Sequence, residues 1–310
     1  MKWDKNYGII IIVGGCKKLS EIIKKIQELD GEQFDLFARN LIDECDRNSL
    51  NQQVIGMGYT KLNEGFIGFK TKISYGSSYD YNYSMKDYEM YIDFLKILKN
   101  KYTKSSNINL SDLIDDVYIY IRNYFKSEKE VIKDPDFSSV RDQIIMEYLE
   151  SITKNPDDTD EWVKNKNELS INAFKGKGVA MCSERTALAQ NLLSLLGVQN
   201  FYCSGVIKNE SEEECTGHAF NILKNNEKYY IVDFSVPVRV YKDGSLYSAL
   251  PYIAEIDDDK VDSLLNDKYA VKFSNYEYDI SSGVSEKRYI EDDRIYGIGL
   301  IEISENRIIR

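Results

Sequence analysis

The chain has 310 residues, enough to bury a sizeable core in one large domain or two modest ones. Its formal net charge of -11 argues against nucleic acid as the main partner, because proteins that bind a phosphate backbone present lysine and arginine on a positive surface. Five cysteines without CxxC spacing favour a reducing compartment over a disulfide framework, and with one histidine they argue against a structural zinc site.

No run approaches the roughly 20 apolar residues that a bilayer crossing needs. The apolar stretch Ile9 to Val13 is too short and too poorly flanked for the core of a secretory signal. We therefore expect a soluble, cytoplasmic protein that makes no membrane contact and uses neither cofactor nor metal. The oligomeric state is left open.

The first 80 residues are predicted to form a mixed α/β region of unknown role. A short strand is expected at Gly8 to Val13, and apolar residues at helical spacing predict helices from Leu19 to Leu29 and from Phe34 to Cys45. Strand-favouring residues follow between Gln53 and Tyr75. We assign residues 1–80 to this region and residues 81–310 to a second domain.

Three amphipathic helices are predicted next. They span Met85 to Leu98, Ser111 to Phe125 with Ser111 as the N-cap, and Val140 to Ile152. Beyond Pro237, strand-like alternation returns near Leu246 to Ile256, Ala270 to Ile280 and Ile295 to Ile303. This order predicts an α+β fold, in which a helical half packs on a mostly antiparallel sheet.

Cys182 is predicted to lie at the N-terminus of a helix. Gly176 and Gly178 precede it, and a leucine stripe follows and ends at Gly197, a typical C-cap. At a helix N-terminus the macrodipole and free backbone amides favour a thiolate. The same amides can donate hydrogen bonds to an oxyanion that forms on a substrate carbonyl.

His218 and Asp233 are predicted to face each other in a β-hairpin. The runs Thr216 to Leu223 and Lys228 to Phe234 favour strands, and a two-residue turn at Asn225 and Asn226 sets His218 directly opposite Asp233. Their Cβ atoms would then lie about 4.5 to 5.5 Å apart, which lets the carboxylate hold one ring nitrogen. A one-residue slip would put the two side chains on opposite faces of the sheet.

These three residues have the chemistry of a nucleophile, its general base and the carboxylate that orients the base. A free thiol with a pKa of roughly 8.5 is mostly protonated at neutral pH, so thiol enzymes recruit an imidazole. His218 is the one imidazole in this chain, so Cys182 has a single candidate base.

The stretch of residues 176–237 resembles the core of the transglutaminase-like superfamily, a branch of the papain-like thiol enzymes. The resemblance rests on the runs Gly178-Val-Ala-Met-Cys182, Leu195-Leu-Gly-Val198, Gly217-His-Ala-Phe-Asn221 and Tyr229-Tyr-Ile-Val-Asp233. It implies a papain/transglutaminase-like core within residues 81–310, with Cys182 as nucleophile, His218 as base and Asp233 as orienting acid. Two departures concern the subfamily: Ser183 and Glu184 follow the cysteine, and Phe220 stands where members often have tryptophan.

Papain-like sites also use a second oxyanion donor from a residue upstream of the nucleophile. Trp162 and the stretch Asn165 to Asn172 are the candidates there. Trp162 is favoured, with packing in the core as its alternative role, and Ser183 is a further candidate for contact with oxyanion or substrate. Glu184 lies in the first helical turn, where its carboxylate complements the dipole. The other cysteines are read as small buried hydrophobic residues.

We therefore expect a cysteine-dependent enzyme that acts on an amide or peptide carbonyl through a thioester, with a peptide or protein as its substrate. Transfer to water makes a protease or amidase, and transfer to an amine makes a transglutaminase. Hydrolysis is favoured, because water needs no second binding site. The alternatives are a noncatalytic binding module with the same fold, and a sensor in which Cys182 serves redox chemistry.

Overall fold

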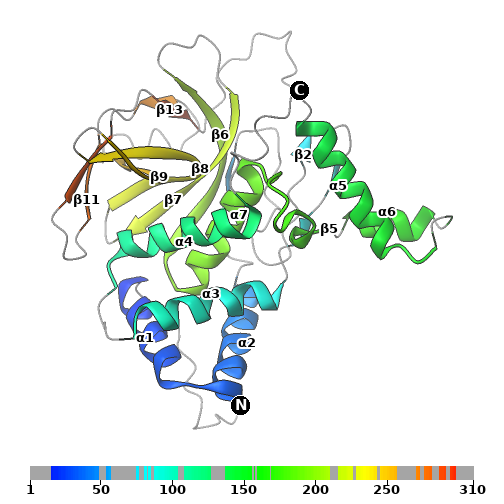
Figure 1. Cartoon of the computed structure of the whole chain (residues 1–310), viewed down its shortest axis with the longest axis horizontal. Coiled ribbons are helices and arrows are strands. Elements are labelled where there is room, and N and C mark those ends of the chain that lie inside the picture. Colours follow the sequence, from blue (N-terminus) through cyan, green and yellow to red (C-terminus); the bar gives the residue numbers. More distant parts are fainter. Residues whose placement is uncertain are drawn as a thin grey trace.

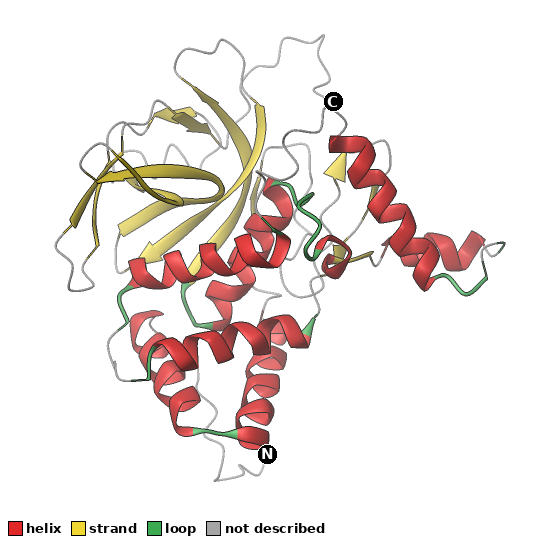
Figure 2. Cartoon of the chain, viewed as in Figure 1, coloured by secondary structure: helices red, strands yellow, loops and turns green. Residues whose placement is uncertain are grey.

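The structure is a computed structural model. It describes residues 15–48, 54–56, 75–76, 80–81, 83–84, 87–103, 108–126, 137–155, 157, 159–167, 169–209, 216–225, 228–242, 245–256, 270–272, 276–280, 286–290 and 294–297. Helices occupy one part of the molecule and a curved, mostly antiparallel sheet the other, as Figures 1 and 2 show. The predicted α+β class is thus confirmed.

The helices of the described residues are α1 (Gly15–Glu28), α2 (Gly31–Asn48), α3 (Tyr88–Lys101), α4 (Leu110–Phe125), α5 (Phe137–Ile152), α6 (Thr159–Asn167) and α7 (Cys182–Leu195), with a 3-10 turn, η4 (Ile171–Phe174), between α6 and α7. All five helices predicted outside the cysteine region are present. Asp87 caps α3, and the predicted cap of α4 is wrong: Asn109 rather than Ser111 caps it by accepting a hydrogen bond from the Ser111 backbone N–H at 3.0 Å. The cap shifted because a residue just outside the helix reaches the free amides best.

The largest sheet has seven strands. Its order is β10 (Ala270–Lys272), β13 (Arg294–Gly297), β6 (Gln199–Asn209), β7 (Thr216–Asn225), β8 (Lys228–Lys242) and β9 (Ser245–Ile256), and β1 (Val54–Gly56) pairs with β6 in parallel. Small two-stranded sheets join β2 (Tyr75–Gly76) to β3 (Asp80–Tyr81), β4 (Tyr83–Ser84) to β5 (Leu169–Ser170), and β11 (Tyr276–Ile280) to β12 (Glu286–Ile290).

The strand predictions are confirmed in part. The stretch predicted at Leu246 to Ile256 is β9. The stretch Ala270 to Ile280 holds two strands, β10 and β11, and the stretch predicted from Ile295 is described only as far as Gly297, in β13. The strand predicted at Gly8 to Val13 lies outside the described residues, as does most of the region between β1 and β2.

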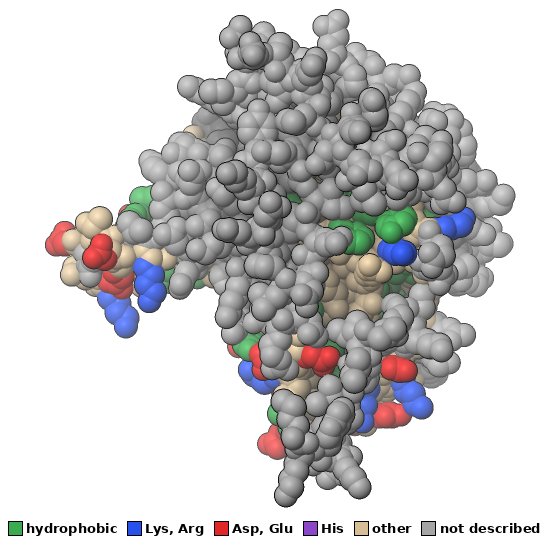
Figure 3. All heavy atoms as spheres, turned by 180° about the vertical axis from the view of Figure 1, so that it is seen from behind, with side chains coloured by type: hydrophobic (Ala, Val, Ile, Leu, Met, Phe, Trp, Pro, Cys, Tyr) green, Lys and Arg blue, Asp and Glu red, His purple; other side chains and the backbone are tan. Residues whose placement is uncertain are grey.

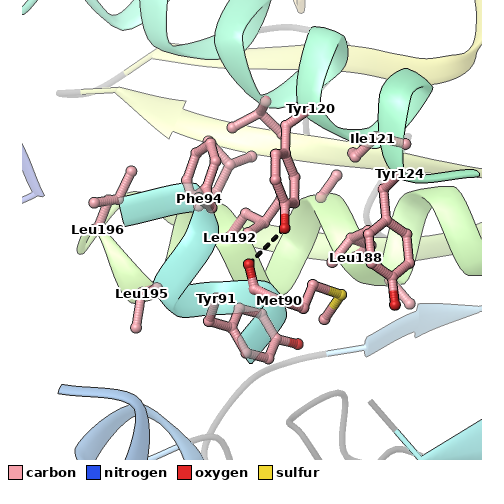
Figure 4. Packing of buried hydrophobic residues seen from close by; sticks show 14 of the residues in the cluster. Met90, Tyr91, Phe94, Tyr120, Ile121, Tyr124, Leu188, Leu192, Leu195 and Leu196 are labelled. Atoms are coloured by element: carbon pink, nitrogen blue, oxygen red, sulfur yellow. Dashed lines mark hydrogen bonds between the residues drawn. The ribbon is translucent and has the colours of Figure 1, made fainter. Parts of the chain in front are cut away.

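Helix α7 is the centre of the core. Each of its residues except Cys182 and Ser194 is buried, because helices α2 and α4 and strands β6, β7 and β8 pack against it, and the Asn191 amide of α7 donates to the Tyr91 hydroxyl of α3. Figure 4 shows Phe94 of α3 and Tyr120 of α4 packed over Leu192, with ring centroids of the two aromatic side chains 5.1 Å apart. Gly197, at a φ of +77°, ends the helix as predicted.

Helices α1 and α2 share this core. Their buried side chains, Ile22 and Phe34 among them, belong to one hydrophobic cluster with α3, α4 and α7. The division predicted at residue 80 stays a prediction, but the described helices on its two sides are packed together. Helices α5 and α6 extend away from the sheet, with acidic and basic side chains interspersed on the extension (Figures 1 and 3), although Ile145 and Leu149 of α5 belong to the same cluster.

Candidate active site

Cys182 is the first residue of α7, as the sequence predicts. Met181 precedes it as the N-cap with extended backbone, and the Cys182 thiol is half-buried and free of any disulfide. The first amides of a helix have no partner within the helix. The backbone N–H of Cys182 is one of them, so a donor for an oxyanion lies beside the sulfur.

The β7–β8 hairpin forms, but its predicted register is wrong by two residues. Leu223 pairs with Tyr230, whereas a turn at Asn225 and Asn226 would pair it with Lys228. Because side chains alternate along a strand, a shift of two keeps His218 and Asp233 on the same face and makes them diagonal neighbours.

Asp233 holds the imidazole of His218 firmly. Its Oδ2 atom lies 2.7 Å from His218 Nε2, and its Oδ1 atom accepts the backbone N–H of Ser235 at 2.8 Å. The Asp233 side chain has no exposed surface and that of His218 is 8% exposed. Both carboxylate oxygens therefore have partners, and water does not compete for them.

The His218 ring also hydrogen-bonds to the Cys182 sulfur. Because Nε2 is bound to Asp233, Nδ1 is the ring nitrogen left for the sulfur. The ring stacks on Phe220, with centroids 6.4 Å apart and planes 20° apart. The structure thus brings the three predicted residues together in the order sulfur, imidazole, carboxylate.

The electrostatics of the cluster favour a protonated imidazole. Burial lowers the pKa of His218, but the charge and hydrogen bond of Asp233, followed by those of Cys182, outweigh it and raise the pKa to about 10. A protonated His218 is the form that can give a proton to a departing amine.

Two hydrogen bonds join helix α7 to strand β7, one helical turn after Cys182. The Thr186 hydroxyl donates to the carbonyl of Ala219 at 2.9 Å, and the Asn221 side-chain amide donates to the carbonyl of Thr186 at 3.2 Å. Ala219 is the neighbour of His218 in the chain. These two bonds therefore fix the distance between the helix that carries the sulfur and the strand that carries the imidazole.

The segment before the cysteine is anchored on α4. Gly176 and Gly178, at φ of +69° and +72°, donate their N–H groups to the carbonyls of Tyr124 at 2.8 Å and Phe125 at 2.7 Å. Only glycine adopts such φ values without strain. The two glycines before Cys182 are thus held in place by the last carbonyls of a helix.

A buried ion pair completes the surroundings of Cys182. Arg141 of α5 is 2% exposed and Glu184 of α7 is fully buried, and their side chains meet at 2.5 Å. Arg141 also donates to the carbonyl of Val179 at 2.7 Å, and Glu184 accepts the backbone N–H of Met181 at 2.7 Å. Sequence alone predicts for Glu184 only a carboxylate that complements the helix dipole, and Arg141, which is distant in the chain, has no sequence signal.

The oxyanion candidates Trp162 and Ser183 have different surroundings. Trp162 is half-buried against the core in α6, which Figure 1 shows at the outer end of the extension, apart from α7. Ser183 is the second residue of α7, and its hydroxyl is buried without a hydrogen-bond partner among the described residues. Neither side chain has a described contact with Cys182.

The described cysteines differ in their environment. Cys203 is fully buried, and burial raises the pKa of its thiol. Cys45 is half-buried in α2 against the core. The side chains of Cys16 and Cys215 lie outside the described part of the chain.

The described residues hold neither a cluster that could bind a metal ion nor a helix that could span a membrane. Within the described residues, histidine, cysteine and carboxylates form no group of three or more that could hold a metal ion. Among the described helices, none combines the length and apolar character that a membrane crossing requires. No protein-family model, curated protein or solved structure matches this chain.

Proposed function

We propose that this chain is a thiol enzyme of the transglutaminase-like type, which cleaves or transfers at an amide or peptide carbonyl. The observation that carries the proposal is the position of His218, which hydrogen-bonds to Cys182 on one side and to buried Asp233 at 2.7 Å on the other. Support also comes from the arrangement of a nucleophile at a helix N-terminus beside an antiparallel hairpin with base and acid, which the sequence resemblance implies.

In the proposed first half-reaction, the Cys182 sulfur attacks the carbonyl carbon and the carbonyl oxygen becomes an oxyanion. The backbone N–H of Cys182 donates to that oxyanion. Collapse of the intermediate breaks the bond between carbon and nitrogen, and protonated His218 gives its proton to the departing amine. A thioester on Cys182 and a neutral imidazole remain.

In the second half-reaction, His218 takes a proton from the acceptor, which attacks the thioester and releases the thiolate. Water as acceptor gives a carboxylic acid, and a primary amine gives a new amide. We propose water as the main acceptor, since transfer to an amine must hold the amine and exclude water.

The first experiment measures nucleophilicity at Cys182. Brief iodoacetamide treatment near pH 6, followed by mass mapping, is expected to label Cys182 well ahead of Cys45 and Cys203, because Cys182 alone has an imidazole partner among these thiols. A p-nitrophenyl ester should acylate the wild-type chain and the Cys45→Ala control equally, and the Cys182→Ala variant should stay unmodified.

The second experiment separates the two acceptors. The purified chain receives a glutamine-bearing peptide and a labelled primary amine, and free acid is expected to accumulate faster than amine-linked peptide. The opposite ratio would identify a transglutaminase. No acylation by the ester, together with equal labelling of Cys182 and Cys45, would overturn the enzyme proposal and leave a noncatalytic binding module.

A further inference from the structure

Arg141 of α5 contacts the backbone segment that precedes Cys182. Its guanidinium donates to the Val179 carbonyl at 2.7 Å and to Glu184 at 2.5 Å. It also lies over the ring of Phe174, with its central carbon 4.5 Å from the ring centroid. The planar group therefore has two polar contacts and one aromatic contact that fix its orientation.

Glu184, which follows Cys182 in the sequence, links Arg141 to the backbone that precedes Cys182. One carboxylate oxygen binds Arg141 and the other accepts the Met181 N–H at 2.7 Å. One ion pair thus holds a carbonyl three residues before the sulfur, an amide one residue before it and a side chain two residues after it.

A second arginine acts on the next carbonyl. The Arg185 side chain is buried and donates to the carbonyl of Ala180 at 3.2 Å. Two successive peptide groups, 179–180 and 180–181, therefore have buried charged partners: the first through the Val179 carbonyl, and the second through both the Ala180 carbonyl and the Met181 N–H. Ordinary folding does not require such a set, because apolar side chains of similar volume are commonly as stable as a buried ion pair.

We propose that Arg141 and Glu184 are positioning residues, which fix the direction of the Cys182 sulfur and its backbone N–H toward the reacting carbonyl. This inference rests on the proposed function and adds to it the residues that set the geometry of the nucleophile. A displacement of about 1 Å in a reacting group can cost about a hundredfold in rate, so a restraint on the two peptide groups before Met181 bears directly on turnover.

The test uses two variants of the full chain. Arg141→Lys keeps the positive charge but lacks the planar fork that bridges Val179 and Glu184. Arg141→Met combined with Glu184→Leu replaces the pair by apolar groups, which removes the buried charges without leaving one unpaired. For each variant, thermal unfolding measures stability, and the rate of iodoacetamide alkylation at Cys182 from pH 5 to pH 9 measures the state of the nucleophile.

We expect both variants to lower the alkylation rate at Cys182 by about tenfold or more. The double variant should be alkylated more slowly at Cys182 even if its thermal unfolding midpoint equals that of the wild type. Such a result would separate an effect on positioning from an effect on stability. The control is Lys101→Met, which breaks the Lys101–Asp116 ion pair between α3 and α4 and touches no residue before Cys182. Its alkylation rate should equal that of the wild type.

A folded double variant that alkylates at the wild-type rate and with the wild-type pH profile overturns the positioning role and leaves the proposed function intact. If wild-type Cys182 itself reacts no faster than Cys45, the proposed function fails and the positioning role fails with it. The wild-type measurement therefore tells the two failures apart.

Discussion

The two nitrogens of His218 have separate partners, and this decides what each partner can do. Nε2 is bound to Asp233, whose other oxygen is occupied by the Ser235 N–H. The carboxylate therefore cannot rotate away without the loss of two hydrogen bonds. It fixes which ring nitrogen faces Cys182, and the orientation of the ring follows from it.

Replacement of Asp233 by asparagine should keep the fold and remove this control. The amide oxygen can still accept the Ser235 N–H, but the neutral side chain no longer stabilises a protonated His218. We expect ester turnover to fall by roughly 10²- to 10⁴-fold, as in other triads in which tautomer control is lost. Circular dichroism should stay unchanged, and turnover within a few-fold of wild type would contradict the orienting role.

The raised pKa of His218 also makes stability depend on pH. The folded-state pKa, about 10, lies above the ordinary value of 6.5, so the folded state holds a proton that the unfolded state releases between these values. The stabilising contribution is complete below pH 6.5 and is lost as pH rises to about 10.

Urea unfolding of the wild type and of a His218→Gln variant checks this dependence. The difference between their free energies of unfolding should shrink from pH 6.5 to pH 10. One proton sets an upper limit of about 1.4 kcal/mol per pH unit on the slope. A difference that stays constant over this range would show that His218 binds its proton no more tightly in the folded state.

The chemistry of Cys182, His218 and Asp233 could be predicted from the sequence, but the register of the hairpin that carries His218 and Asp233 could not. Asparagine favours turns, and this placed the turn one position too early along the chain. The two-residue error in register still leaves His218 and Asp233 on the same face of the sheet, because side chains alternate along a strand with a period of two residues. Long side chains close the larger diagonal separation.

At the scale of elements, the contact of α7 with β7 sets the gap between sulfur and imidazole. The Thr186 hydroxyl and the Asn221 amide cross this contact beside His218. Periodicity predicted both elements, since leucines mark α7 and β-favouring residues mark β7. Periodicity could not predict the contact of Arg141 with the Val179 carbonyl. A helical pattern shows which face of a helix is buried, but not which distant backbone group that face contacts.

A Thr186→Val variant isolates the contact between the two elements. The change keeps the shape and removes the hydroxyl that donates to Ala219, which should cost about 1 kcal/mol in the free energy of unfolding. We also expect slower alkylation of Cys182, because the helix is then less firmly held beside His218.

Thr153→Val is the matched control for this variant. The Thr153 hydroxyl is also buried and also donates to a carbonyl, that of Leu149, at 2.7 Å, but it lies at the end of α5. The Thr153 hydroxyl also accepts a hydrogen bond from the Asn165 amide at 3.0 Å, so this change should cost at least as much stability and leave the alkylation rate unchanged. Equal alkylation rates in the two valine variants would assign Thr186 to stability alone.

At the scale of the molecule, one hydrophobic cluster joins the helices on the two sides of residue 80. Ile22 of α1 has no exposed surface and belongs to the same cluster as the leucines of α7. Apolar periodicity identified α1 and α2 as helices, but it does not encode which surface an apolar face covers. The sequence therefore could not decide whether these helices form a separate unit.

An Ile22→Ala variant tests whether the helices unfold together. Deletion of a buried isoleucine side chain down to alanine should cost roughly 2 to 5 kcal/mol. In a shared core this loss shifts one cooperative transition of the whole chain, monitored by circular dichroism and by exposure of Cys182 to alkylation. The exposed Leu36 of α2 supplies the control, since Leu36→Ala should shift little. An early separate transition that leaves Cys182 protected would support a domain boundary at residue 80.

The anchoring of the glycines on α4 has a consequence for moving this chemistry to another protein. Residues 176–237 contain Cys182, His218 and Asp233, yet Tyr124, Phe125 and Arg141, which hold the backbone before Cys182, lie upstream of them. A graft of that segment alone would carry the sulfur, the imidazole and the carboxylate without the groups that aim the sulfur. The smallest transplantable unit therefore extends from α4 to β8.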